Sequence, residues 1–228
     1  LRSVQGVVRQ IVRDLWTDID KITRRGQVAA ARAAVETSFL WDEFLFTRSG
    51  MTAEQRAAMK ASVMQTAAAG VEAAVARITQ SRSPLSSRVY YSRDLVSGAL
   101  DRRISAALAR GASWKQLSDE VRSSIRPDVK GGVSYAANRL ARTEINNAYH
   151  AVSIAHNESK PWVESMNWAT SGSHPKPDIC DLYADRSPYP KENVPRKPHP
   201  HCFCYTYPNV VDEQEFIRGL QSGRYDDN

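Results

Sequence analysis

The chain has 228 residues, enough for one or two domains, and 42% of them are hydrophobic, which allows a sizeable core. Its three cysteines are few and odd in number, which argues against a disulfide framework and favours a reducing compartment. No apolar run approaches the roughly 20 residues of a membrane-spanning helix, and no signal-peptide pattern opens the chain, so we expect a soluble protein.

The net charge of +6 is unevenly distributed along the chain. Residues 1–132 carry a net +8, and residues 133–228 carry a net −2. A basic first part suits contact with nucleic acid or another acidic surface. The alternative is an ordinary solvated helical exterior, because the basic and acidic residues are interspersed. The sequence leaves both interpretations open.

Residues 2–39 are typical of one long helix, or of two helices joined near Gly26. Apolar side chains recur at helical spacing and form a stripe made of Val4, Val8, Ile11 and Leu15, with Val12, Trp16 and Ile19 beside it. Such a stripe is expected to face another helix or another protein. An apolar knot follows at the end of this segment, at Trp41, Phe44, Leu45 and Phe46.

The next helix is predicted from Ala53 to about Thr79, after a turn at 47–52. Thr52 and Gln55 form a capping box, the pattern in which two side chains satisfy each other's backbone donors at a helix start. The segment 81–88 is predicted to be a linker. A third helix is expected over 93–110, with Leu95, Leu100, Ile104 and Leu108 on one face.

The region between residues 111 and 132 contains glycines and a proline that predict helix ends. Gly111 is placed to end the third helix, and Ser113 with Gln116 forms a second capping box for a short helix. Pro127 and the pair Gly131-Gly132 predict another break.

The last long helix is predicted over 134–156, with Leu140, Ala141, Ile145, Ala148, Val152 and Ala155 on its buried side. His150 and His156 lie near its polar side, where solvation is the simplest expectation. Beyond it, residues 162–170 and 202–210 have the alternation and aromatic content of strands, and we expect them to pair antiparallel.

All three cysteines lie between residues 178 and 207. Eighteen residues rich in proline and charge separate Cys180 from His199, and they show no helical period. Loops of this length without structure are uncommon unless something holds them. A bound metal is one candidate, because three thiolates and one imidazole are the ligands of a closed structural zinc site. The predicted ligands are Cys180, His199, Cys202 and Cys204.

Other readings of these residues stay open. Three buried cysteines without a metal are common core residues. His201 replaces His199 as ligand if His199 faces away from the site. Asp178 and Asp181 flank Cys180 and could orient a ligand histidine, although loop carboxylates are usually solvated.

Several motifs in this order resemble a known family. ANRLARTEINNAYHAV at 137–152 resembles the ARTE-type helix of the Mu F-like phage head-morphogenesis, or minor capsid, proteins. SWKQLSDEV at 113–121 resembles the region that precedes that helix. The ending at 198–204, PHPHCFC, is similar to the family's P-x-HP-x-CRC, with Phe203 where arginine is frequent and a single upstream cysteine. The resemblance covers roughly residues 90–210.

Membership of this family implies a structural role in a virion. The expected partners are the portal protein, the major capsid protein and viral DNA, with no membrane partner and several copies per virion. The expected location is the capsid interior near the portal, after assembly in the host cytoplasm. The family has no shared catalytic activity, so the resemblance implies no enzyme.

A catalytic interpretation of Arg142, Thr143 and Glu144 is weaker than a structural one. Consecutive helical residues point about 100° apart, so these three cannot converge on one substrate atom. Glu144 is expected to accept backbone hydrogen bonds or to pair with an arginine. Two alternatives remain: a zinc-dependent nuclease that uses His199, His201 and nearby aspartates to activate water, and a DNA-binding module built on the basic helical part.

The predicted fold is mainly α, with long N-terminal helices followed by a small α+β C-terminal domain with a short antiparallel sheet and a Cys/His loop. The predicted division is an N-terminal helical region, 1–88, and a Mu F-like domain, 89–228.

Overall fold

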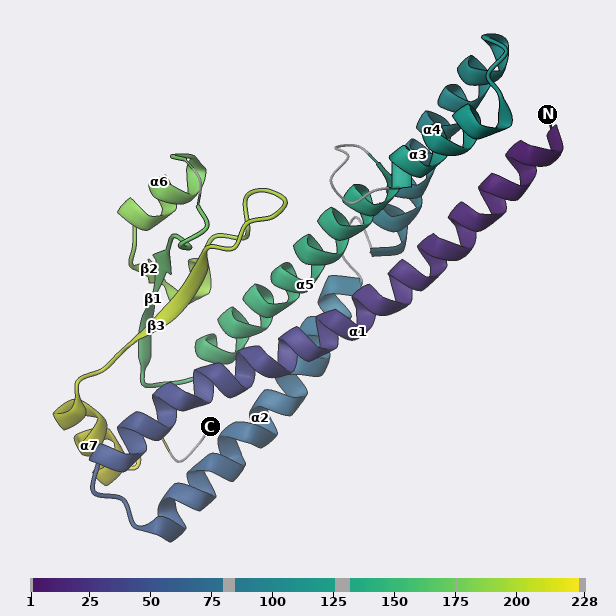
Figure 1. Cartoon of the computed structure of the whole chain (residues 1–228). Coiled ribbons are helices and arrows are strands. Elements are labelled where there is room, and N and C mark those ends of the chain that lie inside the picture. The colour runs from purple at the N-terminus through teal and green to yellow at the C-terminus, as the bar shows by residue number, and fades with distance from the viewer. Residues whose placement is uncertain (1, 80–84, 126–131, 175, 226–228) are drawn as a thin grey trace. The chain divides into compact units, whose positions relative to one another are not determined.

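The computed structural model describes residues 2–79, 85–125, 132–174 and 176–225 (Figure 1). The elements are α1 (Arg2–Arg48), α2 (Ala53–Thr79), α3 (Leu85–Ala109), α4 (Trp114–Ile125), α5 (Val133–Glu158), β1 (Val163–Ala169), α6 (Ile179–Asp185), β2 (Tyr189–Pro190), the 3-10 helix η1 (Lys191–Asn193), β3 (Tyr205–Val210) and α7 (Glu213–Gln221). Within the described segments, none of these helices is both long and apolar enough to span a membrane. The mainly α class with a small C-terminal sheet is confirmed.

The chain forms two compact units that interleave along the sequence. Unit 1 contains residues 1–26 and 79–145, and unit 2 contains residues 27–78 and 146–228. The helices α1 and α5 each contribute one part to unit 1 and the other to unit 2. This division differs from the boundary at residue 88 that the sequence suggested, because α1 and α5 both supply apolar residues to the core of unit 1 and to a separate cluster in unit 2 that contains Ala31, Val35 and Val152.

Helix α1 is continuous through Gly26. A Cβ atom at this position would lie 2.5 Å from Ile145 Cδ1, so the glycine permits close helix packing instead of marking a joint. Val12 and Trp16 are buried apolar residues on the N-terminal part of α1, while Ile11 and Leu15 are exposed.

Ile11 and Leu15, part of the stripe that is expected to face another helix or another protein, are therefore not buried within this chain. The pair Ile11 and Leu15 and the pair Val12 and Trp16 both have helical spacing. The large Trp16 side chain is buried, so the face that carries Val12 and Trp16 packs against the core. Val8 and Ile19 pack against that core, as their place beside Trp16 allows. Val4 lies outside the residues whose side chains are described.

The core of unit 1 joins α1, α3, α4 and α5 through apolar side chains. Its buried members are Val12, Trp16, Val89, Val96, Leu100, Ile104, Ala107, Leu117, Val133 and Leu140. The predicted face of α3 is confirmed for Leu100 and Ile104, whereas Leu95 is exposed.

Helix α3 begins at Leu85, eight residues before its predicted start, so residues 85–88 are helical and not part of a linker. The rest of the predicted linker, 81–84, lies outside the described residues, as do Pro127 and Gly131. Gly111 has a φ of 72°, a left-handed conformation that glycine adopts without strain, and it follows the end of α3 as predicted.

Both capping boxes are confirmed. The backbone N–H of Gln55 donates to Thr52 Oγ1, and the backbone N–H of Thr52 donates to Gln55 Oε1 at 2.9 Å. Ser113 and Gln116 exchange the same pair of bonds. These side chains satisfy donors that the first turn of a helix otherwise leaves unpaired.

The largest core of unit 2 is aromatic. Phe46 lies 5.8 Å from Trp162 and 5.9 Å from Phe216, measured between ring centroids, and Tyr225 stacks on Phe216 at 5.4 Å. Only part of the predicted apolar knot enters this core, because Leu45 and Phe46 are buried while Trp41 and Phe44 are exposed. At about 100° per residue, these four side chains spread over about 200° of the helix surface, so they cannot all face one core.

A buried polar network lies beside this core. Lys160 Nζ donates to Asp42 Oδ2 at 2.6 Å and to Ser38 Oγ at 2.8 Å, and Trp162 Nε1 donates to Asp42 Oδ1 at 2.9 Å. Ser38 also donates to Asn157 Oδ1 at 2.8 Å. The network ties α1 to the end of α5 and the start of β1, because buried charges are stable only when they are paired.

The sheet has the strand order β2-β1-β3 and is antiparallel. Met166 pairs with Pro208 and Trp168 pairs with Thr206, and all four are buried, so these pairs form the inner face of the sheet. The predicted antiparallel pairing of β1 with β3 is confirmed.

The segment that follows Cys180 is more ordered than its sequence indicates. It continues as α6 to Asp185 and then forms β2 and η1. The expectation of a loop without helical structure is therefore wrong. A helix of seven residues is too short to display a helical period, so its capping residues were the only available signal.

Candidate metal centre

Helix α6 fixes the position of Cys180. Asp178 is the N-cap residue, and its carboxylate accepts the backbone N–H of Cys180 at 2.7 Å. Asp181 completes a capping box, because its carboxylate accepts the backbone N–H of Asp178 at 2.6 Å. Cys180 is completely buried, so its thiol points inward from the first turn of a well-capped helix.

A tight turn brings His199 to Cys180. His201 has a φ of 58°, a left-handed conformation, which reverses the chain directly after Pro200. The imidazole Nε2 of His199 lies 3.3 Å from Cys180 Sγ. The chain then enters an extended run in which Cys202 and Cys204 are buried and Phe203 between them is exposed, the alternation expected for a strand.

Three ligand atoms converge at this point. The sulfurs of Cys180 and Cys202 and one imidazole nitrogen of His199 all lie within 4.8 Å of one another, and the two sulfurs are 3.5 Å apart. A tetrahedral zinc ion with its usual bond lengths separates two sulfurs by about 3.8 Å, and a sulfur from a nitrogen by about 3.6 Å. The group could therefore hold a metal ion with only small adjustments.

The lone pairs at this point favour a bound cation. His199 Nδ1 lies 2.9 Å from the carbonyl oxygen of Pro200, which cannot donate, so Nδ1 carries the proton. The other nitrogen, Nε2, faces Cys180 Sγ and, at 3.1 Å, a carboxylate oxygen of Asp178. These three atoms present lone pairs to one another, so either a proton or a metal ion belongs between them.

The remaining predicted ligands lie nearby. Cys204 is buried in the same cluster as Cys180, Cys202 and Trp168, but its sulfur is not one of the three atoms that converge within 4.8 Å. The ring of His201 faces the ring of Phe203, with centroids 6.5 Å apart, and is also outside that group. Among the two histidines, the geometry selects His199.

The electrostatics of the cluster depend on burial. Burial, together with the neighbouring thiols, raises the pKa of Cys180, and burial also raises the pKa of Cys202. The thiols therefore keep their protons unless a cation replaces them. Lys197 lies over the Trp168 ring, 5.6 Å from its centroid, and burial lowers its pKa while the three cysteines raise it. This cation is close enough to offset thiolate charge.

His174, Asp178 and Asp181 form a second group of possible ligand atoms. His174 Nε2 lies 2.9 Å from Asp181 Oδ2, and this hydrogen bond lowers the pKa of Asp181. Both aspartates already serve the cap of α6, and both side chains are partly exposed. We therefore assign this group to helix capping and to holding the ring of His174.

Helix α5 supports the cluster from behind with residues that the sequence did not single out. Asn146 Nδ2 donates to the carbonyl oxygen of Cys202. One turn later, His150 is buried, where solvation was expected, and its Nε2 lies 2.8 Å from the carbonyl oxygen of Pro195. Burial and then the charge of Lys197 lower the pKa of His150 to about 4, so it is neutral and donates. The sequence signal that could have identified these two residues is their spacing. Asn146 and His150 are polar and four residues apart, so they share one face of a helix that is otherwise apolar there.

The residues Arg142, Thr143 and Glu144 do not meet at one point. Arg142 is exposed, Thr143 Oγ1 donates to the Arg139 carbonyl at 2.7 Å, and Glu144 is buried. Arg88 Nη2 donates to Glu144 Oε2 at 2.5 Å, which is the arginine pairing that the sequence offered as one alternative.

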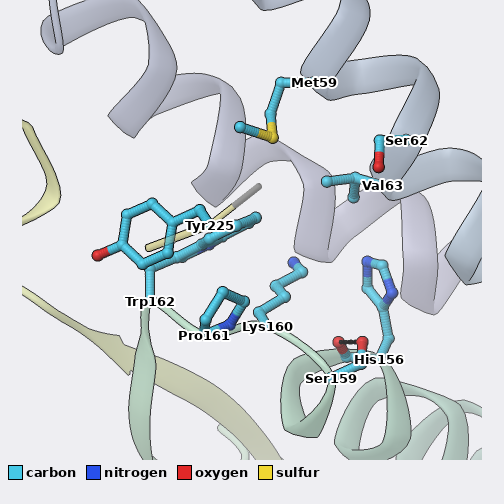
Figure 2. Close-up of a pocket in the computed structure, with 9 residues that line it drawn as sticks. All are labelled: Met59, Ser62, Val63, His156, Ser159, Lys160, Pro161, Trp162 and Tyr225. Carbon is cyan, nitrogen blue, oxygen red and sulfur yellow. Dashed lines mark hydrogen bonds between the residues drawn. The ribbon is translucent and has the colours of Figure 1, made fainter. Parts of the chain in front are cut away.

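A small cavity lies at the end of α5, lined by Met59, Ser62, Val63, His156, Ser159, Lys160, Pro161, Trp162 and Tyr225 (Figure 2). His156 is buried, contrary to expectation, and no described polar atom lies within hydrogen-bonding distance of its ring nitrogens. The cavity volume of about 30 Å³ is enough for one water molecule and far too small for an organic substrate.

No protein-family model, curated protein or solved structure matches the chain. The resemblance to the Mu F-like family therefore rests on the sequence motifs alone.

Proposed function

We propose that this protein is a structural minor head protein of a phage, acting at the portal and the capsid interior during head assembly. In this proposal, the Cys/His cluster binds zinc and fixes the C-terminal part of unit 2. The protein joins other virion components and catalyses no reaction.

The observation that carries the proposal is the contact between its two family-like motifs. The ARTE-type helix motif and the PHPHCFC motif are about fifty residues apart in sequence, yet Asn146 of the first donates to the carbonyl oxygen of Cys202 in the second. Motifs that occur together for a shared structural purpose are expected to touch. This contact supports reading the two motifs as one module.

We assign Cys204 as the fourth zinc ligand. Its thiol is buried beside Cys180, and it lies on the same side of the extended run as Cys202, two residues away. Three thiolates, one neutral imidazole and Zn²⁺ carry a net charge of −1, which the neighbouring Lys197 offsets. A site with four protein ligands has no open position for substrate, which favours a structural role.

The fourth ligand can be tested with two variants. If Cys204 completes the site, Cys204→Ser lowers zinc affinity strongly, while Asp178→Asn changes it little. The reverse order would assign the fourth position to Asp178, whose carboxylate also faces His199. The affinity is measured by competition with a chromophoric zinc chelator.

The charge of unit 1 supports contact with an acidic partner. Unit 1 holds 18 lysines and arginines against 9 aspartates and glutamates, a net +9, whereas unit 2 has a net −3. The charge asymmetry is thus larger between the units than between the two ends of the sequence. Packaged DNA is the acidic polymer available inside a phage head.

Co-expression with the portal protein of the same genome tests the proposal. We expect the two proteins to elute together from a size-exclusion column, earlier than either alone. DNA contact is tested separately with the full-length protein, whose binding to duplex DNA should weaken steeply as salt increases. Separate elution at every ratio would overturn the portal assignment, and absence of DNA retardation at low salt would remove DNA as a partner.

A further inference from the structure

The part of α5 that belongs to unit 1 carries an exposed face that is basic and contains no acidic residue. Asn138, Arg139 and Arg142 are exposed on it, and Tyr135 is half-buried beside them. With about 100° between successive helical residues, these four side chains fall within an arc of about 100°. We call these four residues the α5 outer face. Glu144 is the one acidic residue that α5 contributes to unit 1, and it is buried about 140–160° around the helix from the two arginines.

The acidic residues of unit 1 do not neutralise this face, because other cations already occupy them. Seven of the nine aspartates and glutamates of unit 1 form ion pairs with lysines or arginines elsewhere in the unit. The side chains of Arg139 and Arg142 have no hydrogen-bond or ion-pair partner among the described residues. Like charges about one turn apart on a helix repel each other, so an anion between these two side chains is stabilising.

We propose that the α5 outer face binds the phosphate backbone of duplex DNA and does not read its sequence. This inference rests on the DNA contact proposed above for unit 1, and it assigns that contact to particular residues. Side chains three residues apart on a helix have Cβ atoms about 5–6 Å apart, so both guanidinium groups can reach one phosphate or two neighbouring phosphates of one strand. Asn138 adds an amide donor of the kind that commonly contacts phosphate oxygens.

Other acidic partners fit the α5 outer face less well. A membrane surface is bound by large apolar side chains together with cations, and none of the exposed residues of this face is apolar. Single-stranded nucleic acid is bound by stacking of its bases on aromatic side chains, and Tyr135, the one aromatic residue here, is half-buried. The backbone of a duplex needs only donors and positive charge, which this face supplies.

Retardation of a short duplex of mixed sequence by the full-length protein, measured over a range of salt concentrations, tests this inference. The double variant Arg139→Gln, Arg142→Gln should bind more weakly. The slope of log affinity against log salt should become shallower by about 0.9 for each phosphate contact that is lost. The melting temperature should not change, because both side chains are exposed.

The matched control is the double variant Arg110→Gln, Arg122→Gln. It removes the same two positive charges from unit 1, but both arginines are exposed and already ion-paired with acidic residues of α4. Its salt slope should remain that of the unmodified protein. Equal losses in the two double variants would overturn the inference, because binding would then depend on net charge and not on the α5 outer face.

The remaining outcomes separate this inference from the proposed function. Unchanged DNA binding by Arg139→Gln, Arg142→Gln would overturn the inference and leave the DNA contact of unit 1 in place. If the unmodified protein does not retard DNA at low salt, both the inference and that DNA contact are overturned, while co-elution with the portal protein is judged separately. Intact DNA binding together with lost portal co-elution in this variant would assign the α5 outer face to an acidic surface of the portal instead.

Discussion

The buried ion pair between Asp42 and Lys160 gives the sharpest stability prediction for unit 2. The two side chains are 1% and 3% exposed, and their charged atoms are 2.6 Å apart. Burial raises the pKa of Asp42 and lowers that of Lys160, so each group depends on the other to stay charged. Asp42→Asn preserves the side-chain volume but leaves the lysine cation buried without its counter-charge. We expect a loss of about 3–5 kcal/mol in the free energy of unfolding.

Native-state hydrogen exchange of the amides in β1 measures this loss for unit 2 alone. Lys160→Met should also be destabilising, whereas the double variant should lose less than either single variant, because no unpaired charge remains. Asp185→Asn is the matched control at an exposed aspartate and should change stability by less than about 0.5 kcal/mol. A loss below about 1 kcal/mol for Asp42→Asn would refute the reasoning.

Three further predictions concern single positions. The pKa of His150 in the fold is about 4, below its usual 6.5. The stabilisation from its neutral form is therefore complete above pH 6.5. It declines as the pH falls toward 4, by about 1.4 kcal/mol per pH unit. His150→Gln keeps a donor without a titrating ring, and its stability in acid titrations should fall less steeply over this interval; equal slopes would contradict the assignment. Asn146→Ala should lower zinc affinity about 10–100-fold through the lost bond to Cys202, while Asn147→Ala serves as the neighbouring control and should bind normally. In thermal melts Ile11→Asp should cost less than about 0.5 kcal/mol, and Val12→Asp should cost about 2–4 kcal/mol; similar costs would mean that the buried face is misassigned.

The helices were largely predictable because their signals are local. The capping boxes at Thr52 and Ser113 depend on residues three apart, so the sequence contains the whole device. The face of α1 was not predictable in the same way. Two overlapping stripes both had helical spacing, and only the packing of Trp16 against α3 and α5 distinguishes the buried stripe from the exposed one.

The candidate metal centre was likewise predictable where its signals are local and not where they depend on long-range contacts. The types and spacing of Cys180, His199 and Cys202 indicated metal ligands before any fold was considered. The contribution of α5 could not be foreseen, because Asn146 reaches the cysteine motif across about fifty residues of intervening chain. The buried pair of Asp42 and Lys160 likewise joins residues 118 positions apart, and neither has a local sequence signal.

The central claim, that the Cys/His cluster is a structural zinc site, is tested most directly by elemental analysis of full-length protein purified without chelator. We predict about one zinc ion per chain, lost in Cys180→Ser, together with thiols that react slowly until the metal is removed. Protein that is folded, contains no metal and has three freely titrating thiols would contradict the claim and leave an ordinary buried cysteine cluster in its place.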